Sequence, residues 1–80
     1  MTLTSAEWVE RYAEALGLAP PSDAERDALL DLAGVAAHAA ERTAAPLSCW
    51  LAARAGVDPA EALALAHRLV EQVGQGGEAG

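Results

Sequence analysis

The feature that most constrains the fold of this chain is a set of helix-start signals, each followed by apolar residues at helical spacing. Thr4 and Ser22 are each followed three residues later by a glutamate (Glu7 and Glu25), which is the spacing of a capping box at a helix N-terminus. The tetrapeptide Asp58-Pro59-Ala60-Glu61 combines a capping residue, a first-turn proline and an early acidic residue. No segment alternates apolar and polar residues with the period of a strand. The sequence therefore predicts an all-α protein.

Glycine and proline residues indicate where the predicted helices end and begin. Gly17 and Gly56 each follow an apolar helical pattern, as helix-stopping glycines do, and Pro46 suits the first turn of a third helix. Because the connecting segments are short, we expect a compact antiparallel four-helix bundle. Residues 1–73 would form a single helical domain, and residues 74–80 a flexible Gly-rich tail. The predicted helices span approximately residues 5–16, 23–41, 46–55 and 59–73.

The small size of the chain limits the interior that it can bury. A chain of 80 residues buries only about 60% of the surface that its unfolded form exposes, so its folded state is marginal without further support. Cys49 is the only cysteine, so no disulfide can form within the chain. We therefore expect a protein partner, either a second copy of this chain or another protein.

The charge of the chain argues against nucleic acid as that partner. Twelve acidic and five basic residues give a net charge of −7, and the basic residues are spread evenly along the sequence. Such a chain repels a phosphate backbone. The sequence opens without a signal-peptide pattern and has no run of about 20 apolar residues to span a membrane. We expect a cytoplasmic protein that binds neither nucleic acid nor membrane.

A polar stripe on the second predicted helix is the main candidate for a ligand site. On a helical wheel Asp31, His38 and Arg42 fall close together, with Asp27 on the same side. A histidine flanked by an arginine and an aspartate could act as an acid, a base or an anion clamp. The alternative is a solvated helix face on which Arg42 interacts with the helix dipole. No nucleophile has a fixed place beside these residues, and we predict no catalytic residues.

The remaining histidine and the cysteine do not assemble a metal site in the sequence. Two histidines, one cysteine and scattered carboxylates match no zinc spacing, so we predict neither a metal nor a cofactor. His67 reads as a surface histidine. Cys49 has two interpretations: a reactive thiol whose pKa the helix N-terminus lowers, or a small, half-buried apolar residue.

Two tryptophans, Trp8 and Trp50, are the largest side chains of the sequence. Each lies on the apolar face of a predicted helix, and the chain has no phenylalanine. They would serve either as anchors of the core or as anchors of an interface, where tryptophan is favoured. Both interpretations are open at this point.

Several stretches of the sequence, which together cover nearly the whole chain up to Val73, resemble a known family. The matching residues are the run Leu29-Leu30-Asp31-Leu32-Ala33-Gly34, the pair Ala37-His38, the run Arg42-Thr43-Ala44-Ala45-Pro46-Leu47, and an opening helix with Trp8 and Ala15-Leu16-Gly17-Leu18. These resemble a small actinobacterial helical domain of unknown function, of the DUF6457 type. The sequence departs from that pattern at Thr43 (where proline is favoured), at Val35 (where an acid is favoured) and at Cys49-Trp50.

The resemblance implies a biological setting rather than a reaction. Domains of this type occur alone and at the C-terminal end of proteins that resemble molybdenum-cofactor guanylyltransferases, which implies an accessory role near molybdopterin-dinucleotide synthesis. The Gly-rich loop of the transferase is absent here. We therefore expect a non-enzymatic interaction module that self-associates or binds a nucleotidyltransferase-type protein. The alternative is a domain that binds a phosphate or pterin compound through Asp31, His38 and Arg42.

Overall fold

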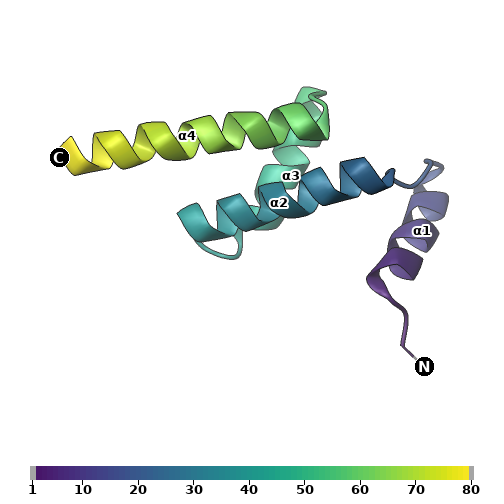
Figure 1. Cartoon of the computed structure of the whole chain (residues 1–80). Coiled ribbons are helices and arrows are strands. Elements are labelled where there is room, and N and C mark those ends of the chain that lie inside the picture. The colour runs from purple at the N-terminus through teal and green to yellow at the C-terminus, as the bar shows by residue number, and fades with distance from the viewer. Residues whose placement is uncertain (1, 80) are drawn as a thin grey trace.

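The chain folds into helices joined by short loops. The computed structural model describes the backbone of residues 2–79 and the side chains of residues 2–73. Within residues 2–79 there is no strand, and the prediction of an all-α bundle of four helices is confirmed. In chain order the helices are α1 (Ser5–Leu16), α2 (Asp23–Ala39), α3 (Ala44–Ala55) and α4 (Pro59–Ala79) (Figure 1).

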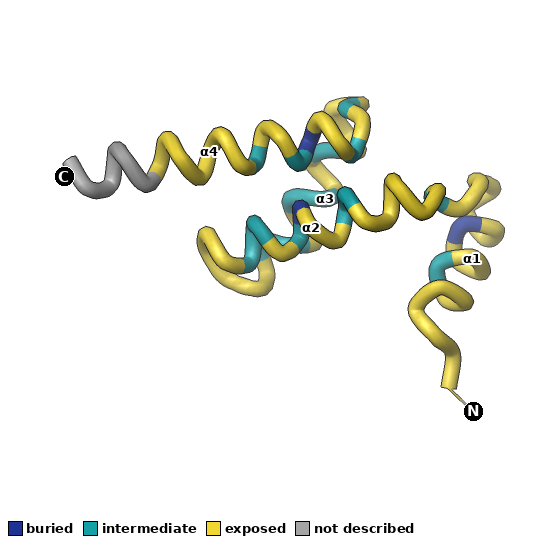
Figure 2. Tube along the Cα trace, viewed as in Figure 1, coloured by how far each residue is buried: buried dark blue, intermediate teal, exposed yellow. Residues whose placement is uncertain are grey.

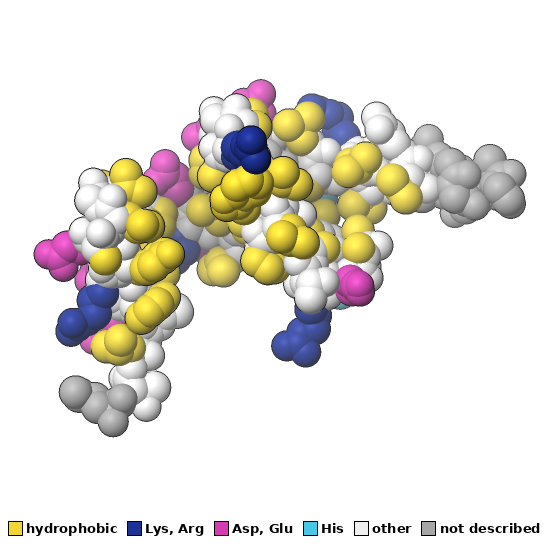
Figure 3. Space-filling model, turned by 180° about the vertical axis from the view of Figure 1, so that it is seen from behind, with side chains coloured by type: hydrophobic (Ala, Val, Ile, Leu, Met, Phe, Trp, Pro, Cys, Tyr) yellow, Lys and Arg dark blue, Asp and Glu magenta, His cyan; other side chains and the backbone are white. Residues whose placement is uncertain are grey.

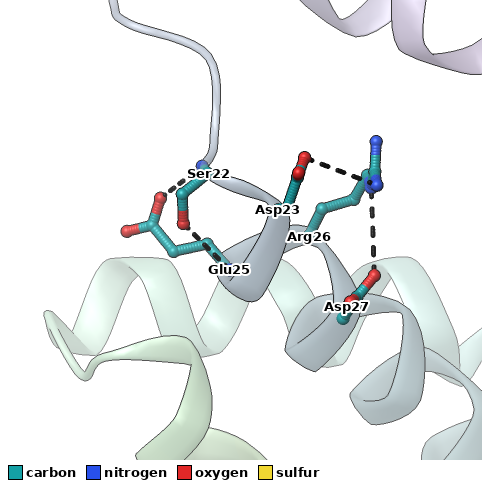
Figure 4. Close-up of polar contacts among 5 residues, drawn as sticks. All are labelled: Ser22, Asp23, Glu25, Arg26 and Asp27. Carbon is teal, nitrogen blue, oxygen red and sulfur yellow. Dashed lines mark hydrogen bonds and ion pairs between the residues drawn. The ribbon is translucent and has the colours of Figure 1, made fainter.

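Capping boxes fix the starts of α1 and α2, as the sequence predicts. The Glu7 backbone N–H donates to Thr4 Oγ1 at 3.1 Å, and the Thr4 N–H donates to Glu7 Oε1 at 2.8 Å. Ser22 and Glu25 repeat this exchange at 3.1 and 2.8 Å (Figure 4). Each box satisfies backbone N–H groups that have no partner inside the helix. Local sequence therefore sets these two helix starts.

The helix ends agree with the predicted ones at two glycines and differ elsewhere. Gly17 and Gly56 both adopt the left-handed conformation, with φ of 76°. α2 stops at Ala39, because Ala40 leaves helical geometry with φ −128° and ψ −89°. α3 begins at Ala44, two residues before its predicted start at Pro46.

The last helix differs most from its predicted length. α4 continues to Ala79, past the predicted end near Val73. A glycine ends a helix when it takes the left-handed conformation, as Gly17 and Gly56 do; otherwise it only weakens the helix, by about 1 kcal/mol relative to alanine. The side chains beyond Val73 lie outside the described residues, and the flexibility of a tail over residues 74–80 stays a prediction.

α2 lies at the centre of the helix packing. It contacts both α3 and α4, whereas α3 and α4 meet only over a small area. α2 and α4 run in the same direction, and α3 crosses back behind them (Figure 1). Only small side chains and one leucine are buried among residues 2–73, namely Ala13, Leu32 and Ala62 (Figure 2). The interior is thin because alanines on α2 admit the neighbouring helices closely but bring little apolar area.

α1 is set apart from the other helices. It makes no close inter-helix contact within the described residues, and it projects from the start of α2 (Figure 1). Its contact is instead with the loop that follows it: Ala13 is buried, Val9 is half-buried, and Val9 faces a hollow that Pro20 and Pro21 also line. The angle of α1 is therefore set by the proline loop rather than by the bundle.

We expect the Ser22→Ala substitution to lower the free energy of unfolding by about 1 kcal/mol, because it removes the side-chain acceptor of the α2 capping box. Thr43→Ala is the matched control, since Thr43 precedes α3 without making a side-chain cap hydrogen bond. Urea unfolding followed by circular dichroism, at one fixed chain concentration, measures both. Equal losses in the two variants would contradict the role of the capping box.

Candidate functional site

The polar stripe predicted on α2 lies along an open groove between α2 and α4. The groove has a volume of about 680 Å³. Asp31 and His38 line it from α2, and His67 lines it from α4. All three side chains are exposed to solvent. The remaining lining residues are apolar or small: Leu30, Gly34, Val35, Ala39 and Val70.

Arg42 does not join this groove. The wheel placed it beside His38 on the assumption that the helix continues to Glu41, but α2 ends at Ala39 and Arg42 lies in the turn before α3. The structure therefore brings together Asp31 and His38, and leaves Arg42 outside the groove lining. The binding role of these three residues stays a prediction.

His67 is the groove residue whose position the sequence analysis missed. The sequence correctly placed it on the surface, but nothing in its local pattern indicates that it shares a groove with His38. That relation depends on α4 packing beside α2, which brings together residues far apart in the chain. Among the described residues, no cluster of three or more histidine, cysteine or acidic side chains is placed to hold a metal ion.

The ion pairs of α2 lie at its start, away from the groove. Arg26 reaches Asp23 at 3.5 Å and Asp27 at 4.0 Å (Figure 4). All three side chains are exposed, so these pairs add little stability. Arg26 nevertheless offsets part of the acidic charge in the first turns of the helix.

Cys49 is a half-buried thiol between α3 and α2. Its Sγ donates a weak hydrogen bond to the carbonyl oxygen of Leu29 at 3.9 Å. Because α3 begins at Ala44, Cys49 lies beyond the first turn, where the helix N-terminus no longer acts strongly on a thiol. Burial instead raises the pKa of the Cys49 thiol. The interpretation as a small apolar residue fits the structure, and that of an activated nucleophile does not.

We expect alkylation of Cys49 by iodoacetamide to rise with pH at a higher midpoint in the folded chain than in the same chain unfolded in urea. The thiolate is the reacting species, and burial disfavours it by raising the thiol pKa. The contribution of the buried, protonated thiol to the free energy of unfolding is fully present below the pKa of the unfolded thiol. It is lost as the pH rises through the pKa of the folded thiol. Faster alkylation of the folded chain at neutral pH would instead indicate an activated thiol.

Both tryptophans lie on the surface of the chain rather than in its core. The exposed fraction is 56% for Trp8 and 57% for Trp50. Trp8 stacks on Tyr12 with ring centroids 5.8 Å apart, and the Arg54 guanidinium lies 5.0 Å from the ring centroid of Trp50. The core interpretation is therefore wrong for this chain, and the interface role of the two residues stays a prediction.

The exposed apolar side chains form rows on several helices, including one of Leu65, Leu69 and Val73 on α4, and we name those on α1 and α3 by their helices. The α1 stripe consists of Trp8, Tyr12 and Leu16, and all three side chains are exposed. The α3 stripe is likewise exposed. Hydrophobic side chains gather over both helices in the view from behind (Figure 3). The residues of the α3 stripe are Leu47, Trp50 and Leu51.

The total accessible surface of the single chain is larger than that of a compact monomer of the same mass. Its accessible surface is 6290 Å², whereas a compact monomer of this mass is expected to expose about 4,500 Å². The difference is roughly 1,800 Å² of polar and apolar surface taken together. Among the described helices, none has the length and apolar character needed to cross a bilayer.

These features define a small all-helical domain whose main surface property is uncovered apolar area. The profile of the family described as "Domain of unknown function (DUF6457)" matches residues 2–78, and the chain belongs to this family. The match confirms the resemblance carried by the Leu29–Leu47 segment. Comparison with curated proteins and comparison with solved structures found no match.

Proposed function

We propose that this chain is a non-enzymatic, cytoplasmic interaction module that binds a protein through its exposed apolar helix faces. The observation that supports this proposal is that its largest apolar side chains lie on the surface while its buried residues are mostly alanine. Burying one such side chain fully is worth about 1.5–3 kcal/mol. Covering the α1 and α3 stripes would therefore add stability comparable with that of the whole folded domain.

The partner in this proposal is a second copy of the chain or a nucleotidyltransferase-type protein. The second possibility is supported by the resemblance to domains attached to guanylyltransferase-like proteins. It assigns the chain an accessory role beside molybdopterin-dinucleotide synthesis. The net charge of −7 favours a protein rather than a nucleic acid as the partner.

We expect the melting temperature to rise when the partner is present, because a partner that binds only the folded state stabilises it by mass action. If the chain self-associates as a dimer, each tenfold increase in its concentration should raise the melting temperature by roughly 3–5 °C. If it binds a nucleotidyltransferase, titration with that protein should raise it instead. Thermal unfolding followed by calorimetry or circular dichroism measures the melting temperature in both experiments. No increase in either experiment would contradict the proposal.

A second candidate function follows from the groove between α2 and α4. Asp31, His38 and His67 are polar side chains along an otherwise apolar lining, which is the make-up of a small-molecule site. In this second proposal the groove holds a phosphate or pterin compound. The support is weaker than for the interaction module, because the groove is open and its polar residues are exposed.

If the groove binds an anion, inorganic phosphate or a pterin should raise the melting temperature of the wild-type chain, and His38→Ala should abolish that increase because His38 lines the groove. Arg42→Ala should leave the increase in place, because Arg42 lies outside the lining. A thermal-shift assay at fixed ionic strength measures all three proteins. An increase that His38→Ala leaves unchanged would exclude the groove as its origin.

A further inference from the structure

The α3 stripe has the spacing of a helix-packing surface. Leu47, Trp50 and Leu51 stand at positions i, i+3 and i+4, and Arg54 follows at i+7, so they lie along one face of α3. The opposite face is already occupied, because Ser48, Cys49 and Ala52 are half-buried and α3 packs against α2. The exposed face is therefore the one available to a further helix.

The α1 stripe is a single apolar row that can pack on such a surface. Trp8, Tyr12 and Leu16 follow one another at four-residue steps, so they form a single row along α1. Trp8 and Tyr12 are already stacked in parallel, with an interplanar angle of 10°. An amphipathic helix of this kind binds by laying its apolar row along an apolar surface.

The loop after α1 opposes closure of the α1 stripe onto α3 of the same chain. Gly17 adopts the left-handed conformation, and the Leu18 N–H donates to the Ala13 carbonyl at 2.8 Å, which fixes the exit from the helix. Pro20 and Pro21 restrict the rest of the loop.

Charge selects α3 as the surface on which α1 docks. α1 carries three glutamates and one arginine, so two α1 helices repel each other. α2 and α4 also carry more acidic than basic residues. α3 contains no acidic residue, and its one charged side chain, Arg54, lies beside Trp50. A helix as acidic as α1 therefore meets opposite charge on α3 and like charge on α1 or α2.

The area involved matches that of a stable dimer. The excess of roughly 1,800 Å² of total surface per chain exceeds the approximately 800 Å² that each partner contributes to a standard interface. Two chains that each covered most of their excess would form an interface in the range of obligate homodimers, about 2,000–5,000 Å². A second copy of the chain is thus sufficient to cover the exposed stripes.

We infer that two copies of this chain form a symmetric dimer in which the α1 stripe of each copy packs on the α3 stripe of the other. This inference rests on the proposed interaction function and commits it to one partner. The two-fold symmetry creates two identical α1–α3 contacts, one on each side of the axis. Trp8 and Trp50 then lie in one interface, where tryptophans contribute most to binding.

Three variants that each add one negative charge test the pairing. Tyr12→Glu and Leu47→Glu alter the two stripes. Leu30→Glu is the control, because Leu30 has an exposed fraction of 64%, against 62% for Leu47, but lines the α2–α4 groove instead. In analytical ultracentrifugation we expect the wild-type chain to be a dimer. Each stripe variant should raise the dissociation constant at least about 30-fold, the effect of losing one hot-spot residue, and Leu30→Glu should change it little.

Mixing the two stripe variants distinguishes this pairing from the alternatives. A mixed dimer of Tyr12→Glu and Leu47→Glu keeps one intact α1–α3 contact and concentrates both substitutions in the other. It should therefore form more tightly than either variant does with itself. Pairing of α1 with α1 and of α3 with α3 leaves no contact intact in the mixture, so no gain would be seen. The mixture also shows that each variant remains able to fold.

Several outcomes would overturn the inference. A wild-type chain that is monomeric at all concentrations would do so, and the interaction function would still be supported if a nucleotidyltransferase raised the melting temperature. Equal weakening by Leu30→Glu would place the interface at the groove. A dimer whose stripe variants gain nothing on mixing would rule out the α1–α3 pairing while supporting self-association.

Discussion

The contact of α2 with both α3 and α4 is the interaction on which the rest of the structure depends. It is built largely from alanines, which let helices approach closely but remove little apolar area from water. Leu32 is the only large side chain buried among residues 2–73. Burial is worth about 0.8 kcal/mol for each methylene group, so an interior of this kind holds three helices in position with a small margin. The leucines and tryptophans whose burial would increase the free energy of unfolding lie on the surface.

Much of the fold could be predicted from the sequence because much of it is fixed locally. The capping boxes at Thr4 and Ser22, and the left-handed glycines 17 and 56, act within a few residues of the chain. Their effect does not depend on which helix lies alongside. The end of α4 shows the limit of this reasoning: a glycine in the sequence is compatible with a stop or with a weakened helix, and only its φ distinguishes the two.

The candidate site was less predictable, for a different physical reason. A helical wheel relates residues on one helix, so it placed Asp31 and His38 on one side correctly. It could not show that α2 ends before Arg42, nor that α4 brings His67 to the same groove. In the same way, the wheel identified the apolar rows with Trp8 and Trp50 but not what covers them. Periodicity gives the direction in which a side chain points on its own helix. Which element lies opposite that side chain is known only from the tertiary arrangement.

Acidic charge and apolar stripes have to coexist on this surface without causing indiscriminate association. The net charge of −7 keeps unassembled chains apart, because most approaches bring acidic faces together. α3 is the exception, since it carries an apolar row and Arg54 but no acidic residue. An acidic amphipathic helix can therefore dock there at lower electrostatic cost than on α1 or α2. Repulsion elsewhere on the surface selects the orientation, and apolar burial along α3 supplies the affinity.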